Sequence, residues 1–196
     1  MNRRELLTGG AIGAIAGGAG CAAVDSYSNI PTPEHSGTII SYHIVKAYMI
    51  AHNKRIGSKQ IPTYQILDDD YTVITKKYLK EYTKFFNNFI FYNTNMDTRP
   101  ATANSGELDE STDCDNFALL YKGLAGSASW RDTKGVDITI GAMSVYQKNA
   151  AMGVPEGGAH MLNFAITEDS YYAIEPQTGR IMDFKEYKNP IFFYII

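Results

Sequence analysis

The spacing of the apolar residues changes once along this chain, and this change restricts the possible folds more than any other feature. In the first part, apolar residues recur at helical spacing over residues 38–53, 72–91 and 111–124. In the second part they alternate with polar residues, as over residues 136–140 and 160–166. Three further segments are expected to be extended: 61–67, 171–174 and 191–196. Helices followed by antiparallel strands indicate an α+β domain, with N-terminal helices packed on a C-terminal antiparallel sheet.

Composition and charge exclude several classes of protein. The chain has 196 residues, of which 44% are hydrophobic and 20% are charged, so we expect one globular domain with a tail rather than a disordered chain. The formal net charge of −3 provides no general attraction for nucleic acid. Two cysteines are too few for a disulfide scaffold or a four-cysteine zinc site, and the acidic run 68–70 lacks EF-hand spacing. We therefore expect no cofactor, no metal ion and no nucleic-acid partner.

The N-terminus is expected to be an export signal rather than part of the fold. Residues 1–21 begin with Arg3 and Arg4, continue with a Gly/Ala-rich stretch and end at Cys21. The start resembles a twin-arginine export motif, and Gly-Ala-Gly-Cys resembles a lipobox, in which Cys21 becomes lipidated. An uncleaved membrane anchor over residues 6–23 is the alternative. Both interpretations place the domain outside the cytoplasm, anchored to a membrane of the cell envelope on the periplasmic side or at the cell surface.

The rest of the chain divides into a tether and one domain. Residues 22–36 contain Ser, Pro and Ala without periodicity, which is typical of a flexible linker. The folded domain is expected to occupy residues 37–196.

One cysteine remains in the domain once the N-terminal cysteine is assigned to lipidation. Cys114 follows Ser111 and Thr112, either of which is a good N-cap, so the thiol is expected in the first turn of a helix. The helix dipole favours a thiolate there, whereas the flanking Asp113 and Asp115 disfavour it. A reactive Cys114 therefore requires a basic partner, and the alternative is a small buried core residue.

A histidine and a glutamate in the second half are placed to supply that partner. His160 begins a strand shortly after two glycines, and a four-residue loop over 167–170 joins this strand to the next. If the residues on either side of the loop pair, His160 faces Gln177 and has Glu175 as its diagonal neighbour on the same face. Glu175 or Gln177 can then hold the imidazole, which completes a Cys-His-acid arrangement. The alternative for His160 is a core histidine with satisfied hydrogen bonds.

The motifs around these residues resemble a known superfamily. Asp-Cys-Asp-Asn-Phe-Ala is followed by a histidine 46 residues after the cysteine and, 15 residues later, by the glutamate of Ile-Glu-Pro-Gln-Thr-Gly. This pattern resembles the papain-like and transglutaminase-like cysteine enzymes. It is similar to the small papain-like domains of phage and bacterial proteins and of some fungal agglutinins, over residues 61–183. The resemblance implies a papain-like core with Cys114 as nucleophile, His160 as base and Glu175 as the residue that orients the base.

One element of that family's site is missing from the sequence. Papain places a glutamine shortly before its cysteine, whereas residues 104–113 contain none. The backbone N–H of Cys114 is then the natural oxyanion donor. Gln177 and Asp113 are candidates for a secondary role at the site.

These observations predict a function and leave alternatives open. We expect an exported, membrane-anchored cysteine hydrolase (a peptidase or amidase) or a transamidase, which acts through a thioacyl intermediate on envelope peptides or proteins. One alternative is a catalytically inactive papain-like fold that serves as an envelope binding module. The other is a structural surface lipoprotein in which Cys114 is a core residue. Whether the domain is an enzyme stays open at this point.

Overall fold

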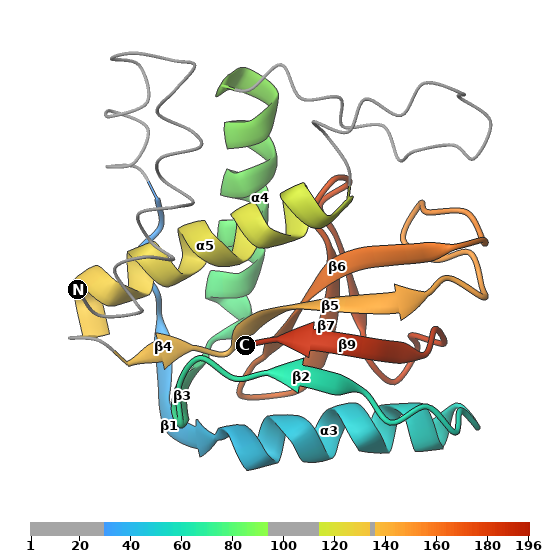
Figure 1. Cartoon of the computed structure of the whole chain (residues 1–196). Helices are drawn as coiled ribbons and strands as arrows, with labels where there is room; N and C mark the ends of the chain where they lie inside the picture. The colour runs from blue at the N-terminus through green and yellow to red at the C-terminus, as the bar shows by residue number, and fades with distance from the viewer. Residues whose placement is uncertain (1–29, 94–113, 134–135) are drawn as a thin grey trace.

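The computed structural model describes residues 30–93, 114–133 and 136–196, which form three helices and nine strands in two sheets (Figure 1). The predicted export signal over residues 1–21 and Asp113 lie outside these residues. In the described part of the chain, no helix is both long enough and apolar enough to cross a membrane. The combination of helices with strand-rich sheets confirms the predicted α+β class.

A six-stranded sheet forms the larger layer. Its strand order is β2-β9-β5-β6-β7-β8, and all neighbours are antiparallel except β2 and β9, which run parallel. The strands span Thr63–Gln65 (β2), Ile140–Tyr146 (β5), Ala159–Ile166 (β6), Tyr171–Glu175 (β7), Arg180–Asp183 (β8) and Ile191–Ile195 (β9). The predicted strands over 160–166, 171–174 and 191–196 are confirmed, and so is the antiparallel sheet of the second half. Most of β5 lies beyond the predicted strand 136–140, β8 was not predicted, and β2 from the first half adds a parallel edge strand.

A second, three-stranded sheet has the order β1-β3-β4. β1 (His35–Ser41) pairs antiparallel with β3 (Asp70–Ile74), which pairs parallel with β4 (Asp137–Ile138). Parts of β1 and β3 were predicted to be helical, and both predictions were wrong. The segments Thr-Ile-Ile and Tyr-Thr-Val-Ile are rich in β-branched and aromatic residues, which fit a paired strand. The helices begin after these strands, at α3 (Tyr42–Arg55) and α4 (Lys76–Asn93).

The packed part of the chain begins before the predicted boundary at residue 37. Ile30 is 5% exposed and belongs to the hydrophobic core on the α4 side of the sheet. The carbonyl of Glu34 accepts a hydrogen bond from the N–H of Thr75, at 2.8 Å. Residues 30–36 therefore pack as part of the domain, although the sequence assigned them to the tether.

Helix α4 starts where its backbone N–H groups find acceptors outside the helix. The hydroxyl of Thr75 accepts from the N–H of Tyr78 at 3.1 Å, and Glu168 accepts from the N–H of Lys76 at 2.9 Å. The apolar stripe predicted on this helix is confirmed, because Tyr78, Tyr82 and Phe86 are fully buried. This face fixes α4 against the core.

Helix α5 (Cys114–Thr133) extends well beyond the predicted end at residue 124. The face of this helix that carries Phe117 and Tyr121 is buried, and Ala125 and Ala128 continue that face. The glycines of this helix lower its intrinsic propensity. Packing on the sheet overrides that propensity and prolongs the helix.

The two faces of the six-stranded sheet carry separate cores. Helices α4 and α5 cover one face, and α3 covers the other (Figure 1). The side chain of Thr139, fully buried, joins the two sheets. Its hydroxyl donates to the carbonyl of Ile166 in β6 at 2.6 Å and accepts from the N–H of Ile74 in β3 at 3.4 Å.

Candidate thiol site and adjoining pocket

Cys114, the first residue of α5, is the only cysteine in the described part of the chain. The sulfur of Cys114 accepts a hydrogen bond from the backbone N–H of Met161 in β6, at 3.3 Å. The predicted position in the first helical turn is confirmed, and the sulfur contacts a strand of the six-stranded sheet. The side chain is partly exposed, so the sulfur lies at the surface end of the core.

The β6–β7 hairpin has the register that the sequence predicted. Residues 167–170 form the loop, and Ile166 pairs with Tyr171 across it. The ladder continues to the pair Asn163 and Ile174. A slip of one residue would have moved the side chains beyond the ladder to opposite faces. Because the register holds, His160 and Glu175 lie on one face.

His160 and Glu175 make direct contact at the end of this hairpin. His160 Nε2 lies 2.6 Å from Glu175 Oε2. The carboxylate side chain is fully buried, and its other oxygen accepts a hydrogen bond from the N–H of Gln177 at 3.0 Å. Both oxygens of a buried acid are thus partnered, which removes the main cost of burying it. We call Cys114, His160 and Glu175 the thiol site.

The environment keeps His160 protonated at neutral pH. Burial lowers the pKa of His160, but hydrogen bonds to Cys114 and to Glu175, together with the charge of the carboxylate, outweigh that effect. The pKa is raised from 6.5 to about 9. The thiol site therefore contains a buried imidazolium–carboxylate pair beside a sulfur.

This arrangement places a thiol, an imidazole and a carboxylate in series. An imidazole beside a thiol can take its proton and stabilise the thiolate, and a carboxylate on the imidazole fixes its orientation. The candidate secondary residues do less. Gln177 supports Glu175 through its backbone N–H, and Asp113 lies outside the described residues.

A pocket of about 660 Å³ lies at the loop end of the β5–β6 hairpin. We call it the hairpin pocket, and it is lined by Tyr146, Gln147, Lys148, Glu156 and residues 157–159. Its last residue immediately precedes His160 in β6. Sequence reasoning noted the two glycines here but did not predict the pocket, because its walls come from both ends of the long loop that joins β5 to β6.

The two glycines keep this pocket open. Gly157 and Gly158 have φ angles of 125° and 65°, which favour glycine, and a Cβ atom at either position would meet nothing within 4 Å. Tyr146 stands on the opposite strand with 45% of its surface exposed, and its ring centroid lies 4.5 Å from that of Phe192. The pocket therefore combines an exposed aromatic ring with charged side chains and free space.

Metal binding finds no support in the part of the chain that the structure describes. No group of three or more His, Cys, Asp or Glu residues there could hold a metal ion. The run 68–70 leads into β3, where Asp70 pairs with Ser41.

The fold and the site define an α+β domain in which a thiol at the start of a helix lies near an imidazole and a carboxylate from two neighbouring strands. Two solved structures share this fold. One is the lectin of Polyporus squamosus bound to the human-type influenza-binding epitope Neu5Acα2-6Galβ1-4GlcNAc, with 17% identity and a TM-score of 0.56 over 81% of this chain. The other is a PSL1a–E64 complex, with 18% identity and a TM-score of 0.54 over 81% of this chain. No protein-family model and no curated protein sequence matches the chain.

These comparisons have a limited extent. The chain spans about half the length of the two solved structures, 49% and 50% of them. At such low sequence identity the likeness concerns the fold.

The comparisons nevertheless correct the function expected from the sequence. We expected a cysteine hydrolase or a transamidase that acts on envelope peptides or proteins. The structures that share this fold include a lectin bound to a sialylated glycan, and this finding overturns that expectation. A cysteine, a histidine and a glutamate in contact define a local geometry, and this geometry does not specify what the surrounding surface binds.

Proposed function

We propose that this chain is a ligand-binding domain, and that its ligand is a glycan held in the hairpin pocket. The observation that carries the proposal is that the exposed residue Tyr146 lines the same pocket as Gly157 and Gly158, around which there is free space. The papain-like and transglutaminase-like architecture belongs to this proposal as the scaffold of the pocket.

The composition of the hairpin pocket suits a saccharide. The C–H groups of a sugar ring pack on an aromatic face, and its hydroxyl groups require polar partners around that face. Tyr146 supplies the face, with Phe192 behind it. Lys148 and Glu156 supply charged partners at the rim, and both are exposed. The sialylated ligand of the lectin with this fold supports the choice of ligand class.

The thiol site is close to this pocket along the ladder but does not line it. Tyr146 pairs with Ala159, and the next pair along the same ladder is Val145 with His160. Because successive side chains of a strand point to opposite faces, the imidazole of His160 points away from the face that carries Tyr146 and Ala159. The proposed glycan contacts therefore belong to the residues that line the pocket.

A glycan-binding measurement tests this proposal. The full chain would be titrated with Neu5Acα2-6Galβ1-4GlcNAc and with its unsialylated disaccharide, and binding would be followed by calorimetry. An aromatic contact is worth about 1 kcal/mol, so we expect Tyr146→Ala to weaken binding about fivefold to tenfold. Tyr64→Ala is the matched control, because Tyr64 is 40% exposed on the far edge strand β2. No saturable binding, or equal weakening by both variants, would contradict the proposal.

We propose separately that the residues of the thiol site keep the roles implied by the resemblance. Cys114 is a nucleophile towards electrophilic probes, His160 is its basic partner, and Glu175 positions the imidazole. The 2.6 Å contact between His160 and Glu175 and the influence of Cys114 on the pKa of His160 support these roles. E64 is a suitable probe, because it forms a complex with a protein of this fold. Adduct formation at Cys114, read by mass spectrometry, would support the role, and an inert Cys114 in the folded chain would contradict it.

We also propose export and membrane attachment, on the basis of Arg3, Arg4 and Cys21. Expression of the full chain in a bacterial host, with separation of membrane and soluble fractions, tests both. Lipidation predicts that Cys21→Ala moves the protein out of the membrane fraction, whereas an uncleaved anchor predicts no change. Accumulation of the wild type in the cytoplasm would refute export.

A further inference from the structure

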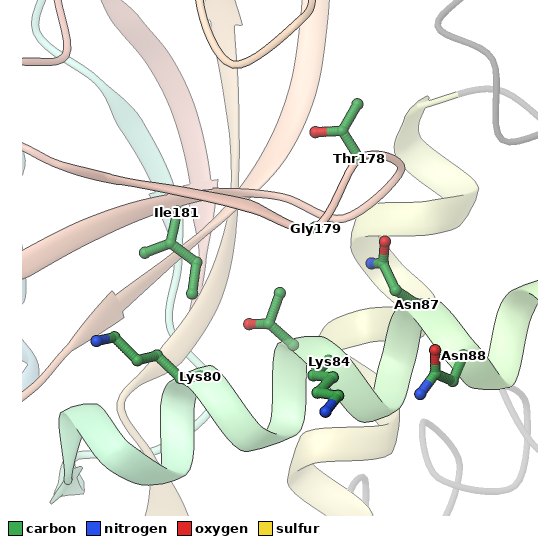
Figure 2. Close-up of a pocket in the computed structure, with 8 residues that line it drawn as sticks. Lys80, Lys84, Asn87, Asn88, Thr178, Gly179 and Ile181 are labelled. Atoms are coloured by element: carbon green, nitrogen blue, oxygen red, sulfur yellow. The ribbon is translucent and has the colours of Figure 1, made fainter.

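A second pocket lies between α4 and the turn that joins β7 to β8 (Figure 2). Its volume is about 370 Å³. We call it the lysine pocket, and it is lined by Lys80, Thr83, Lys84, Asn87, Asn88, Thr178, Gly179 and Ile181. It shares no lining residue with the hairpin pocket.

The lysines of α4 divide into two pairs with different surroundings. Lys76 lies 3.0 Å from Asp169, and Lys77 lies 3.4 Å from Glu34, so the first pair is neutralised. Lys80 and Lys84 line the pocket, are exposed, and have no acidic partner within 4.0 Å among the residues that the structure describes. Residues four apart in a helix share a face, so the two free ammonium groups belong to one surface. Among the residues that line this pocket, Lys80 and Lys84 are the charged ones, although the chain carries a net charge of −3.

The wall opposite the lysines is held in place by hydrogen bonds. Asn87 donates from Nδ2 to the carbonyl of Pro176 at 3.0 Å, and Thr178 donates from its hydroxyl to the carbonyl of Met152 at 3.0 Å. Figure 2 shows Asn87 pointing from α4 towards the turn at Thr178 and Gly179. The pocket is therefore formed before any ligand arrives, which reduces the entropic cost of binding.

Gly179 allows the turn to approach the helix this closely. Its φ angle is 67°, and a Cβ atom at this position would lie 2.7 Å from Asn87 Oδ1. A side chain at this position would displace the amide of Asn87 that bonds to Pro176. The segment Pro-Gln-Thr-Gly after Glu175 thus contributes to both sites. The N–H of Gln177 bonds to Glu175 in the thiol site, and Thr178 and Gly179 line the lysine pocket.

We propose that the lysine pocket binds the anionic oxygen group of a small ligand: a carboxylate, a sulfate or a phosphate. Two ammonium groups and the exposed amide of Asn88 supply donors, and an anion placed there neutralises charge that has no acidic partner within 4.0 Å among residues 30–93, 114–133 and 136–196. The volume of the pocket is at the lower end of the range for small-molecule sites. This binding does not depend on the proposed glycan site, because the two pockets are lined by different residues.

Titration of the full chain with acetate, sulfate and phosphate at constant ionic strength tests the proposal and distinguishes the three groups. Binding would be followed by calorimetry and by the amide NMR signals of Thr178 and Gly179. We expect saturable binding of at least one anion, with shifts of these two signals. The double variant Lys80→Gln/Lys84→Gln should weaken it by about tenfold or more, since charge-assisted bonds are worth about 1.5–3 kcal/mol each.

The matched control is Lys77→Gln/Lys185→Gln, which removes the same charge from exposed lysines outside the pocket. The control should bind the anion as the wild type does. A second variant, Asn88→Ala, should weaken binding without loss of charge. Absence of saturable binding by all three anions overturns the proposal, and so does an equal loss in the control, which would indicate general attraction to the surface.

Discussion

Two buried histidines of this domain respond to their surroundings in opposite ways. His160 in the thiol site contacts the carboxylate of Glu175, and its pKa is raised to about 9. His52 at the end of α3 is 4% exposed, and burial, together with the positive charges of Arg55 and Lys188, lowers its pKa to about 4 against a backbone hydrogen bond that raises it. The charge of the neighbour therefore decides which form of a buried histidine is stable.

The contacts of His52 explain its structural role. Its Nε2 lies 3.0 Å from the carbonyl oxygen of Asn189, and its Nδ1 lies 3.1 Å from Arg55 Nη2. A neutral ring with the proton on Nε2 satisfies both neighbours, because Nδ1 then accepts from the guanidinium. His52 thus anchors α3 to the segment before β9, whereas His160 holds a charge next to a thiol.

The largest expected effect comes from removing the partner of His160. Glu175→Ala leaves a buried imidazolium without its carboxylate, and breaking a buried ion pair costs about 3–5 kcal/mol. We expect the free energy of unfolding, measured in urea at pH 6, to fall by this amount. Glu186→Ala is the control, because Glu186 is exposed. A loss under about 1 kcal/mol in Glu175→Ala would show that the pair is not needed for stability.

The pH dependence of stability should distinguish the two histidines on the alkaline side. The pKa of His160 is higher in the folded state than the unfolded value of 6.5. Its contribution is therefore complete below pH 6.5 and is lost as the pH rises through 9. We expect a loss on the order of 3 kcal/mol across this interval. Urea titrations of His160→Gln should lack this loss, and an unchanged alkaline slope in that variant would contradict the assignment.

The reactivity of Cys114 should depend on His160. A protonated imidazole beside the sulfur stabilises the reactive thiolate, and a charge-assisted contact is worth about 1.5–3 kcal/mol. We therefore expect His160→Ala to slow alkylation of Cys114 by iodoacetamide at pH 7 by about tenfold to 100-fold. His43→Ala is the control, because His43 is exposed on α3. Equal rates in wild type and His160→Ala, with both proteins folded, would remove the basis for a nucleophilic role.

The smallest effect is expected for the contribution of His52 to the free energy of unfolding below pH 6.5. Its folded pKa lies below the unfolded value, so the unfolded state binds a proton first and stability falls as the pH decreases from 6.5 towards 4. Between pH 6.5 and 5 this amounts to about 2 kcal/mol. Urea titrations should show a flatter acid slope for His52→Gln than for the wild type. If the free energy of unfolding depends on pH equally in both proteins, groups other than His52 determine the loss of stability in acid.

The sequence predicted the geometry of the thiol site better than it predicted the first part of the fold. A loop of four residues determines the register of a hairpin, and the register places His160 beside Glu175. Helix capping likewise placed Cys114 in the first turn of α5. Both predictions depend on residues close together in the chain.

The errors arose where distant segments decide the structure. Residues 38–41 and 72–74 have apolar residues that fit either a helix or a strand, and only their mutual pairing selects the strand. The burial of His52 depends on Asn189, which is 137 residues away. The proposed ligand class had no local signal in the sequence either, because the pocket residues Tyr146 and Glu156 belong to no recognisable motif.

The hydroxyl of Thr139 also has a consequence for how the domain opens. It bridges β3 and β6, which belong to different sheets, through contacts at 3.4 Å and 2.6 Å. A transient separation of one sheet from the other must break both hydrogen bonds together. The amide protons of the two strands should therefore exchange with solvent deuterium in one cooperative event, and Thr139→Val should split that event into two.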